Sequence, residues 1–256
     1  MEIFTSYYTD KGTVKQVNQD SFSVKVVNSP RGKIAFVTVS DGMGGLEMGE
    51  VASKEVVVAY NNWFVTQFAD MVKTDRFTKE ELFEQWQDLA DALNTKLETY
   101  AGNQGMMMGT TLSALLIYRD RYYVCHIGDS RIYKIDSAIE QITEDQTLVA
   151  QEVRLGMLTE DEAQSDPRRS ILLQCIGASA IIEPQYETGN IEGEVTFLLC
   201  SDGFIHMNTE VELFNTFSPW NIKDKEQGNA LCKEMVQHAE ELGERDNITV
   251  VAVVTR

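Results

Sequence analysis

The sequence predicts an α+β fold in which antiparallel sheets are covered by helices. Strand-like segments occur in runs, helical patterns separate these runs, and the helices are too few for a repeating βα unit. The chain has 256 residues, of which 43% are hydrophobic, and contains only 17 Gly and 4 Pro. This composition supports a substantial core and excludes collagen-like and disordered classes. No linker rich in Pro, Gly or Ser divides the chain, so residues 1–256 are expected to form a single domain.

The first strands are expected at residues 21–28 and 33–40. The second contains the run Ile-Ala-Phe-Val-Thr-Val, which is typical of a strand buried on both faces. Two helices should follow. The first carries an apolar face made of Ala52, Val56, Ala59, Trp63 and Phe64. The second is expected to begin with a capping box, Thr78 and Glu81, ahead of an apolar stripe that reaches Tyr100.

More strands are expected in the second half of the chain, at residues 111–118, 122–127, 131–135, 195–200 and 248–255. The first three of these are predicted to form a meander. A last helix is expected over residues 224–242, where apolar residues recur at helical spacing and Gly243 would end the helix.

Residues 146–179 do not fit the core pattern, because this segment is polar and has its own capping box at Thr159 and Glu162. It also contains the turn-like sequence Asp166-Pro167-Arg168-Arg169. The segment is predicted to be an inserted surface flap, and a plain long connection is the alternative.

The charge balance limits the classes of partner. There are 40 acidic and 22 basic residues, which give a formal net charge of −18. A nucleic-acid partner is excluded, since it needs clustered Lys and Arg against the phosphates. Two interpretations of the acidic residues remain open. They keep the protein soluble, or some of them gather to hold divalent cations.

The cysteines favour a reducing compartment. The chain has 4 Cys, without a C-x-x-C pair, and each lies in an apolar stretch. A disulfide framework and a zinc site are therefore not expected. The first ten residues do not form a leader, and no stretch approaches the roughly 18 apolar residues of a membrane span. We expect a cytoplasmic protein without a membrane partner.

Three acidic motifs stand at the ends of predicted buried strands. Asp41-Gly42 and Asp202-Gly203 follow such strands, and Asp246-Asn247 precedes the last one. Carboxylates that converge there would repel one another unless cations neutralise them, and ligation by oxygen alone suits Mg²⁺ or Mn²⁺. The alternative for each Asp-Gly is a simple turn. The three histidines have no metal-binding spacing and are interpreted as surface or core residues.

Six motifs occur in order: Gly12-x-Val14-x-x-x-Asn18-x-Asp20, Ser40-Asp41-Gly42-Met43-Gly44-Gly45, Gly109-Thr110-Thr111, Ile127-Gly128-Asp129-Ser130-Arg131, Ser201-Asp202-Gly203 and Asp246-Asn247. This set resembles the PP2C-type (PPM) metal-dependent serine/threonine phosphatases, above all their compact bacterial members. The resemblance implies a four-layer α/β/β/α sandwich of two antiparallel sheets flanked by helices, with a dinuclear metal site at one end. Residues 148–177 are similar to the mobile flap of the bacterial branch.

The resemblance also implies a role for each motif residue. Asp41 would bridge two Mn²⁺ or Mg²⁺ ions, and the Gly42 carbonyl would bind one of them. Asp202 and Asp246 would ligate the other ion, and Asp129 would help to hold a third, weaker one.

Three further positions have an implied role outside the metal ligands. Asp20 would orient a metal-bound water, and Asn247 would support its loop. The chain departs from the family at Lys15, where an Arg usually binds the substrate phosphate, and at Gln19, where a Glu is usual. Lys15 is still the expected phosphate-binding residue, although Lys lacks the bidentate fork of Arg.

The implied reaction is hydrolysis of phosphoserine and phosphothreonine on proteins by attack of a metal-bridging water. Phosphorylated proteins are the expected partners, with a cognate serine/threonine kinase or its targets. A non-catalytic phosphoprotein-binding module on the same fold is one alternative. An acidic metal-buffering or interaction protein is another.

Overall fold

The computed structural model describes residues 1–30, 32–43 and 48–256. In this part of the chain the strands form two five-stranded antiparallel sheets. The first sheet contains, in spatial order, β1 (Ile3–Asp10), β10 (Ile248–Thr255), β9 (Val195–Cys200), β6 (Arg131–Ile135) and β7 (Ile139–Gln141). The second contains β2 (Asp20–Ser29), β3 (Gly32–Asp41), β4 (Leu112–Tyr118), β5 (Arg121–Ile127) and β8 (Gln185–Asn190).

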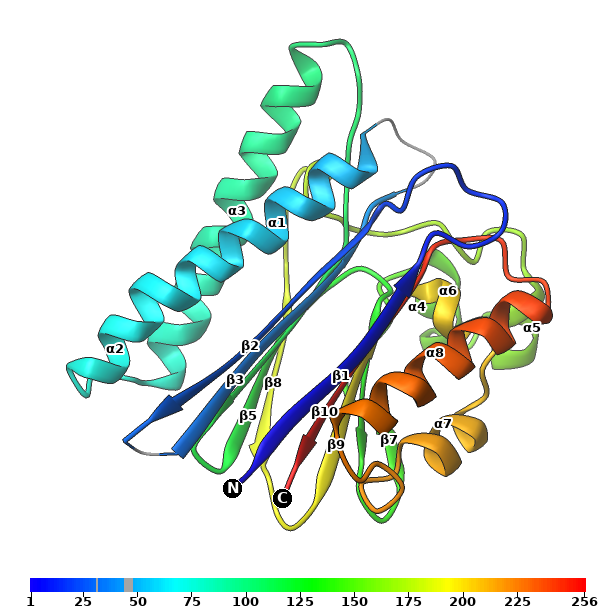
Figure 1. The fold of residues 1–256 in the computed structure, drawn as a ribbon. Helices are drawn as coiled ribbons and strands as arrows, with labels where there is room; N and C mark the ends of the chain where they lie inside the picture. Colours follow the sequence, from blue (N-terminus) through cyan, green and yellow to red (C-terminus); the bar gives the residue numbers. More distant parts are fainter. Residues whose placement is uncertain (31, 44–47) are drawn as a thin grey trace.

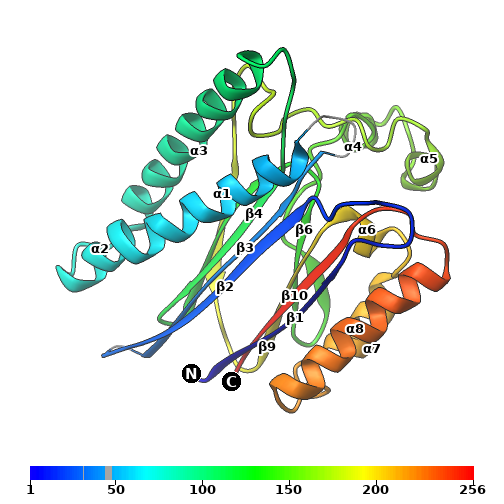
Figure 2. The ribbon, with the colours of Figure 1, turned by 45° about the horizontal axis from the view of Figure 1, so that its top comes forward.

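Helices cover the outer face of each sheet (Figures 1 and 2). The second sheet is covered by α1 (Gly49–Trp63), the π-helical turn η1 (Phe64–Phe68), α2 (Ala69–Lys73) and α3 (Lys79–Gly102). The first is flanked by α6 (Asp202–Ile205), α7 (Glu210–Phe217) and α8 (Lys225–Glu241). The predicted four-layer α+β sandwich is confirmed. No helix within the described ranges is both long and apolar enough to cross a bilayer.

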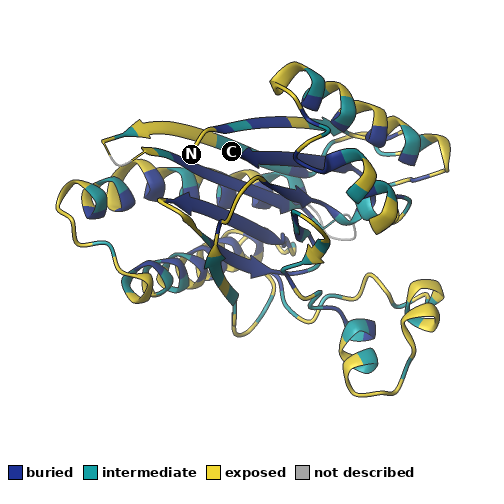
Figure 3. Cartoon of the chain, turned by 90° about the horizontal axis from the view of Figure 1, so that it is seen from below, coloured by how far each residue is buried: buried dark blue, intermediate teal, exposed yellow. Residues whose placement is uncertain are grey.

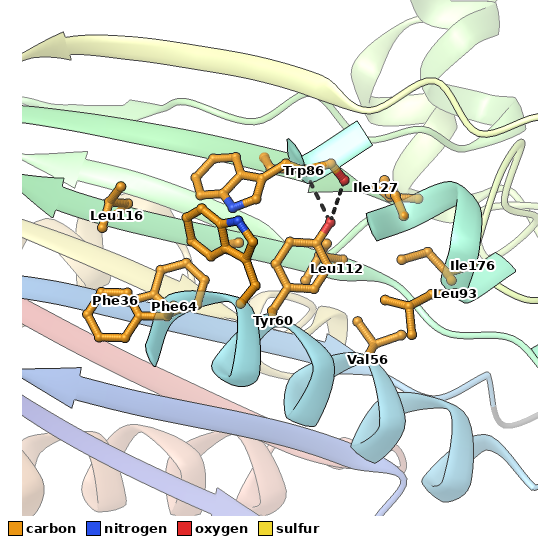
Figure 4. Close-up of a cluster of buried hydrophobic side chains, with 14 of the residues drawn as sticks. Phe36, Val56, Tyr60, Phe64, Trp86, Leu93, Leu112, Leu116, Ile127 and Ile176 are labelled. Carbon is orange, nitrogen blue, oxygen red and sulfur yellow. Dashed lines mark hydrogen bonds between the residues drawn. The ribbon is translucent and has the colours of Figure 1, made fainter. Parts of the chain in front are cut away.

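Three apolar clusters hold the layers together. Residues of both sheets, including Val37, Leu115, Phe197 and Val253, form the cluster between the sheets. A second cluster lies between the second sheet and α1 and α3, where Phe36, Phe64 and Trp86 pack among aliphatic side chains (Figure 4). In it Tyr60 donates its hydroxyl hydrogen to the Trp86 carbonyl oxygen at 3.2 Å, so its buried polar group is satisfied. The third cluster lies between the first sheet and α8.

The helix signals of the sequence act as expected at several ends. Of the capping box predicted at Thr78 and Glu81, the described residues show only the forward bond, in which the Thr78 hydroxyl accepts from the Glu81 backbone N–H at 3.1 Å and starts α3, because Glu81 Oε1 accepts from Gln85 instead. Asp224 caps α8 in the same way, through the Gln227 N–H at 2.9 Å. After α8 the chain turns at Gly243, whose φ of 98° lies in the left-handed region.

The predicted meander is wrong in its third strand. β4 and β5 pair with each other, but β6 pairs with β9 and β7 in the other sheet. The chain leaves β5 at Gly128, whose φ of 105° ends the strand, and enters the first sheet at Arg131. Local apolar alternation gives no information about which sheet a strand joins.

The flap leaves the sandwich as two short helices, α4 (Leu148–Arg154) and α5 (Glu160–Ser165), at the mostly exposed protrusion in Figure 3. Its base is closed by backbone hydrogen bonds from Leu148 N–H to Ile171 O and from Leu173 N–H to Gln146 O, both 2.8 Å. The predicted Thr159–Glu162 capping box is present with both reciprocal bonds.

The two sheets bring four strand ends to one end of the sandwich. β2 begins there and β3 ends there, while β9 ends and β10 begins beside them (Figure 1). The chain termini lie together at the opposite end, where Glu2 N–H donates to Arg256 O at 2.6 Å. The predicted acidic motifs therefore share one end of the molecule.

Candidate functional site

Asp20 and Asp41 are brought together by strand pairing. They are direct partners in the antiparallel register of β2 and β3. Gly42 continues this contact, since its N–H donates to Gln19 O at 3.1 Å. A Cβ on Gly42 would collide with the backbone oxygen of Gly49, so the start of α1 approaches as closely as it does because residue 42 is glycine.

One oxygen of Asp20 is held and the other is left open. Ser201 donates its hydroxyl to Asp20 Oδ2 at 2.9 Å and accepts from the Thr249 N–H at 2.9 Å. Asp20 Oδ1 is buried without a hydrogen-bond partner among the described residues. A buried carboxylate oxygen in this state is poised for a ligand.

Asp202 and Asp246 follow from the pairing of β9 with β10. Asp202 begins α6 directly after β9, and Asp246 lies in the turn that leads into β10. A Cβ on Gly203 would collide with the Asn247 carbonyl oxygen, so a glycine is needed where these two turns meet.

Asn247 connects the turn before β10 to the segment that leads into β2. Its Oδ1 accepts from the Gln19 N–H at 2.9 Å. Its Nδ2 donates to Lys11 O at 2.9 Å and to Val17 O at 3.1 Å. The side chain therefore fixes the backbone next to Asp20 relative to the backbone next to Asp246.

The carboxylates interact strongly. Burial raises the pKa of Asp20 to about 7, and the charges of Asp202 and Asp246 add to this, while the hydrogen bond from Ser201 opposes it. Burial also raises the pKa of Asp41 well above its usual range, followed by the charges of Asp20 and Asp202. For Asp129 the causes are burial and then Asp202. Asp129, which follows β5, thus belongs to the same electrostatic cluster.

A cluster of mutually repelling carboxylates is the donor set that a hard divalent cation prefers. The open Asp20 Oδ1 and the raised pKa values both fit such a cation. Within the described ranges, no three His, Cys, Asp or Glu side chains are already arranged as a metal cage. The carboxylates gather at one end of the sandwich, where burial and neighbouring charges raise the pKa values of Asp41, Asp129 and Asp202.

Lys15 forms an ion pair with one of these carboxylates, Asp246. Its Nζ is 2.7 Å from Asp246 Oδ1, so it acts as a counter-ion inside the acidic cluster. Gln19, the other departure from the family pattern, donates from Nε2 to Glu50 Oε2 at 3.4 Å. Gly44 and Gly45, which were predicted to continue the Asp41 loop, lie outside the described residues.

The three histidines differ in their surroundings. His126 is a buried core residue between Ser113 and Gly128, as the sequence predicts. His238 contacts Asn208 on the outer side of the first sheet. His206 lies beside Asp202 and Glu244, which the sequence did not indicate, because positions 206 and 244 are far apart and neither forms a motif.

Comparison with known proteins shows that the chain is similar to protein phosphatases. A family model described as Protein phosphatase 2C matches residues 11–246. The chain is similar to "Protein phosphatase PhpP" of Streptococcus pneumoniae, with 33% identity over 258 residues, covering 99% of this chain and 97% of that protein. It is also similar to "Serine/threonine phosphatase stp" of Listeria monocytogenes, with 30% identity over 253 residues, covering 96% and 94%.

Solved structures agree with these relatives. The S. agalactiae serine/threonine phosphatase superposes with a TM-score of 0.83 at 27% identity, over 98% of this chain and 99% of that one. The catalytic domain of the serine/threonine protein phosphatase PstP, solved in complex with two manganese ions, has a TM-score of 0.76 at 26% identity, covering 99% of each chain.

Proposed function

The chain belongs to the protein phosphatase 2C family, and on that premise we propose that it hydrolyses phosphoserine and phosphothreonine in proteins with the help of divalent cations. The observation that carries this proposal is the convergence of Asp20, Asp41, Asp129, Asp202 and Asp246 at one end of the sandwich, where burial, and then the charges of neighbouring carboxylates, raises the pKa values of the first four. Such a cluster suits a phosphate dianion only when cations lie between the two.

We assign the metal-holding groups as follows. The first ion would be held by Asp41 and the Gly42 carbonyl. The second would be held by Asp41 together with Asp202 and Asp246. Asp129 would contribute to a third and weaker site. Bound Mn²⁺ or Mg²⁺ supplies charge neutralisation for phosphate oxygens and a lower pKa for water.

The chain's own residues would position the reactants. Asp20 would accept a hydrogen bond from the attacking water through Oδ1, while Ser201 keeps Oδ2 fixed. Asn247 would hold the backbone next to Asp20 through its bonds to Gln19, Lys11 and Val17. Lys15 would leave Asp246 and bind a phosphate oxygen as the substrate enters.

The reaction is a direct displacement. The water oxygen forms a bond to phosphorus while the bond from phosphorus to the Ser or Thr oxygen breaks in line with it. The attacking water gives up one proton and the departing oxygen gains one, so the products are inorganic phosphate and the dephosphorylated protein with its free hydroxyl.

The proposal also covers the extent of the domain, the compartment and the substrates. Residues 1–256 are proposed to act as one phosphatase domain, since a single cluster of apolar side chains joins the two sheets. The four free, buried cysteines support a reducing, cytoplasmic compartment. Targets of a cognate serine/threonine kinase, or the kinase itself, are the proposed substrates.

A metal-dependence assay tests the proposal. Phosphate release from a phosphothreonine peptide and from para-nitrophenyl phosphate is measured with Mn²⁺, with Mg²⁺ and after EDTA. Turnover that requires the cation supports the phosphatase. Tight binding of the phosphopeptide without turnover would instead indicate a binding module, and Mn²⁺ binding without either would indicate a metal buffer.

A further inference from the structure

His206 connects two carboxylates. Its Nδ1–H donates to Glu244 Oε2 at 3.2 Å, and its Nε2 lies 3.7 Å from Asp202 Oδ2. The second distance is too long for a hydrogen bond, so this imidazole approaches Asp202 without occupying a lone pair of Oδ2. The backbone N–H of His206 donates to Asp202 O at 3.0 Å, which fixes the ring on the same helical turn as Asp202.

Glu244 continues the connection to the other loop. It is buried, and its Oε1 accepts from the backbone N–H groups of Arg245 at 2.7 Å and Asp246 at 2.9 Å. Its own N–H donates to Ala239 O at 3.0 Å, which anchors it to the end of α8. These charge-assisted bonds hold the turn that carries Asp246.

An unbroken series of contacts therefore runs from the Asp202 side chain through His206 and Glu244 to the Asp246 backbone. Nothing in the proposed chemistry uses His206 or Glu244 directly. Both Glu244 carboxylate oxygens already accept hydrogen bonds, and His206 Nδ1 is held by Glu244, so the two side chains link the ligand-bearing turns to each other.

We propose that His206 and Glu244 are positioning residues that hold Asp202 and Asp246 at the separation needed to share one cation. The inference rests on the proposed function for the identity of the two ligands. Groups that orient metal ligands in this way commonly change metal affinity by about 10- to 100-fold when removed.

Mn²⁺ binding, measured by calorimetric titration without substrate, tests the pair. His206→Ala and Glu244→Ala should each weaken binding at the Asp202–Asp246 site by about 10- to 100-fold. Because the two residues act as a unit, the double variant should bind no more weakly than the weaker single variant. His206→Gln, whose amide can still donate to Glu244, should recover part of the loss.

Two controls remove similar contacts elsewhere. His238→Ala removes a histidine that contacts Asn208 Oδ1 at 3.3 Å, and Glu212→Ala removes a glutamate that accepts from the Thr209 N–H at 2.8 Å. Both should leave Mn²⁺ affinity unchanged. The phosphatase assay adds a second readout, since saturating Mn²⁺ should restore kcat in His206→Ala without changing KM for substrate.

Several results would overturn the proposed positioning role of His206 and Glu244. These are an unchanged Mn²⁺ affinity in both alanine variants, losses that multiply in the double variant, or no recovery in His206→Gln. If the wild-type protein binds Mn²⁺ and the two alanine variants lose affinity as predicted, but the wild-type protein hydrolyses no phosphopeptide, the positioning role is supported and the proposed function is overturned. If the wild-type protein hydrolyses the phosphopeptide while both alanine variants bind Mn²⁺ normally, the proposed function is supported and the positioning role is overturned.

Discussion

The carboxylate end of the sandwich and the flap lie on the same chain but are held in different ways. At the carboxylate end, buried side chains such as Ser201 and Asn247 bond to backbone and side-chain groups of distant segments. In the flap, Val149 is the buried residue of α4, and α5 has none. Arg168 binds Glu152 and Asp166 there, but these are pairs within the flap near solvent.

The contrast separates two tasks. Buried hydrogen bonds between segments fix ligand positions closely, which a metal site needs. Surface ion pairs are weak and screened by salt, so a flap held by them can adjust to a protein substrate. We therefore expect changes at the carboxylate end to affect the chemistry itself and changes in the flap to affect the choice of substrate.

The largest effect is expected from removing a ligand charge. Asp202→Asn or Asp246→Asn should lower kcat by more than about 100-fold, because a lost ligand costs more than a lost supporting contact. The fold should survive, since the change relieves repulsion among the carboxylates. Kinetics at limiting Mn²⁺ and a thermal melt without metal measure both.

A matched control is Asp70→Asn, an exposed carboxylate that pairs with Arg76 far from the site. It should keep wild-type kinetics. Near-full activity of Asp202→Asn or Asp246→Asn at limiting Mn²⁺ would show that the metal assignment is wrong and that the carboxylate end has no special role.

Lys15 provides the next test, because it joins the acidic cluster through Asp246. If it transfers to the substrate phosphate, Lys15→Ala should raise KM by about tenfold to a hundredfold, the value of a charge-assisted hydrogen bond. Lys15→Arg should lower KM or leave it unchanged, because the guanidinium fork matches two phosphate oxygens. Steady-state kinetics at matched Mn²⁺ and ionic strength measure both.

Lys11→Ala is the control, since Lys11 is exposed in the same segment. If both Lys15 variants keep the parent's kcat and KM, Lys15 serves Asp246 alone. That result would remove the phosphate-binding role without affecting the aspartates, which depend on separate motifs.

The sequence predicts most of the fold because most elements carry local signals. The run from Ile34 to Val39, the cap at Thr78 and the helical spacing of apolar residues over 224–242 are such signals, and the structure shows the strand and helices that they predict. β8 was not predicted, since Gln185–Asn190 is polar and contains a glycine. Its strand conformation comes from pairing with β5, which is a tertiary effect.

In the candidate site too, some residues are predicted from local motifs and others are found only in the structure. Asp41, Asp202 and Asp246 stand in recognisable motifs at strand ends, so the sequence is enough to predict that they converge. The ion pair of Lys15 with Asp246 and the contact of His206 with Glu244 join residues far apart in the chain. No local pattern records such contacts, because they depend on how the turns around β9 and β10 meet.

A smaller effect, and one that depends on the substrate, is expected for the flap. Replacing residues 152–166 with a short Gly-Ser link should lower activity on a phosphoprotein more than on para-nitrophenyl phosphate. The protein substrate can touch the flap, whereas the small one meets chiefly the metal site. The ratio of the two kcat/KM values is the measurement.

The double variant Glu152→Gln, Asp166→Asn is the matched control, since it removes the partners of Arg168 but keeps the segment. It separates loss of the ion pairs from loss of the surface. Equal losses on both substrates in the Gly-Ser variant would contradict a recognition role, and the contrast with the carboxylate end would no longer hold.

The smallest effect on activity is expected at His126, a buried residue of β5, where the change should instead alter the pH dependence of stability. Its Nε2–H donates to Gly128 O at 3.0 Å and its Nδ1 accepts from Ser113 Oγ at 2.9 Å. Burial lowers the pKa of His126 from 6.5 to about 4, with the Asp145 charge opposing this shift and the Arg131 charge adding to it. The folded protein therefore keeps this ring neutral.

The sign of the pH dependence follows. Between pH 6.5 and about 4 the unfolded chain binds a proton at His126 and the folded protein does not, so this residue lowers stability as the pH falls. The stability of wild type relative to His126→Gln should thus decrease by up to about 3 kcal/mol across this window. Urea unfolding of both proteins at a series of pH values measures the difference, with His238→Gln as a control. A constant difference would show that His126 titrates normally, and the carboxylate end would then be less tightly packed than its hydrogen bonds indicate.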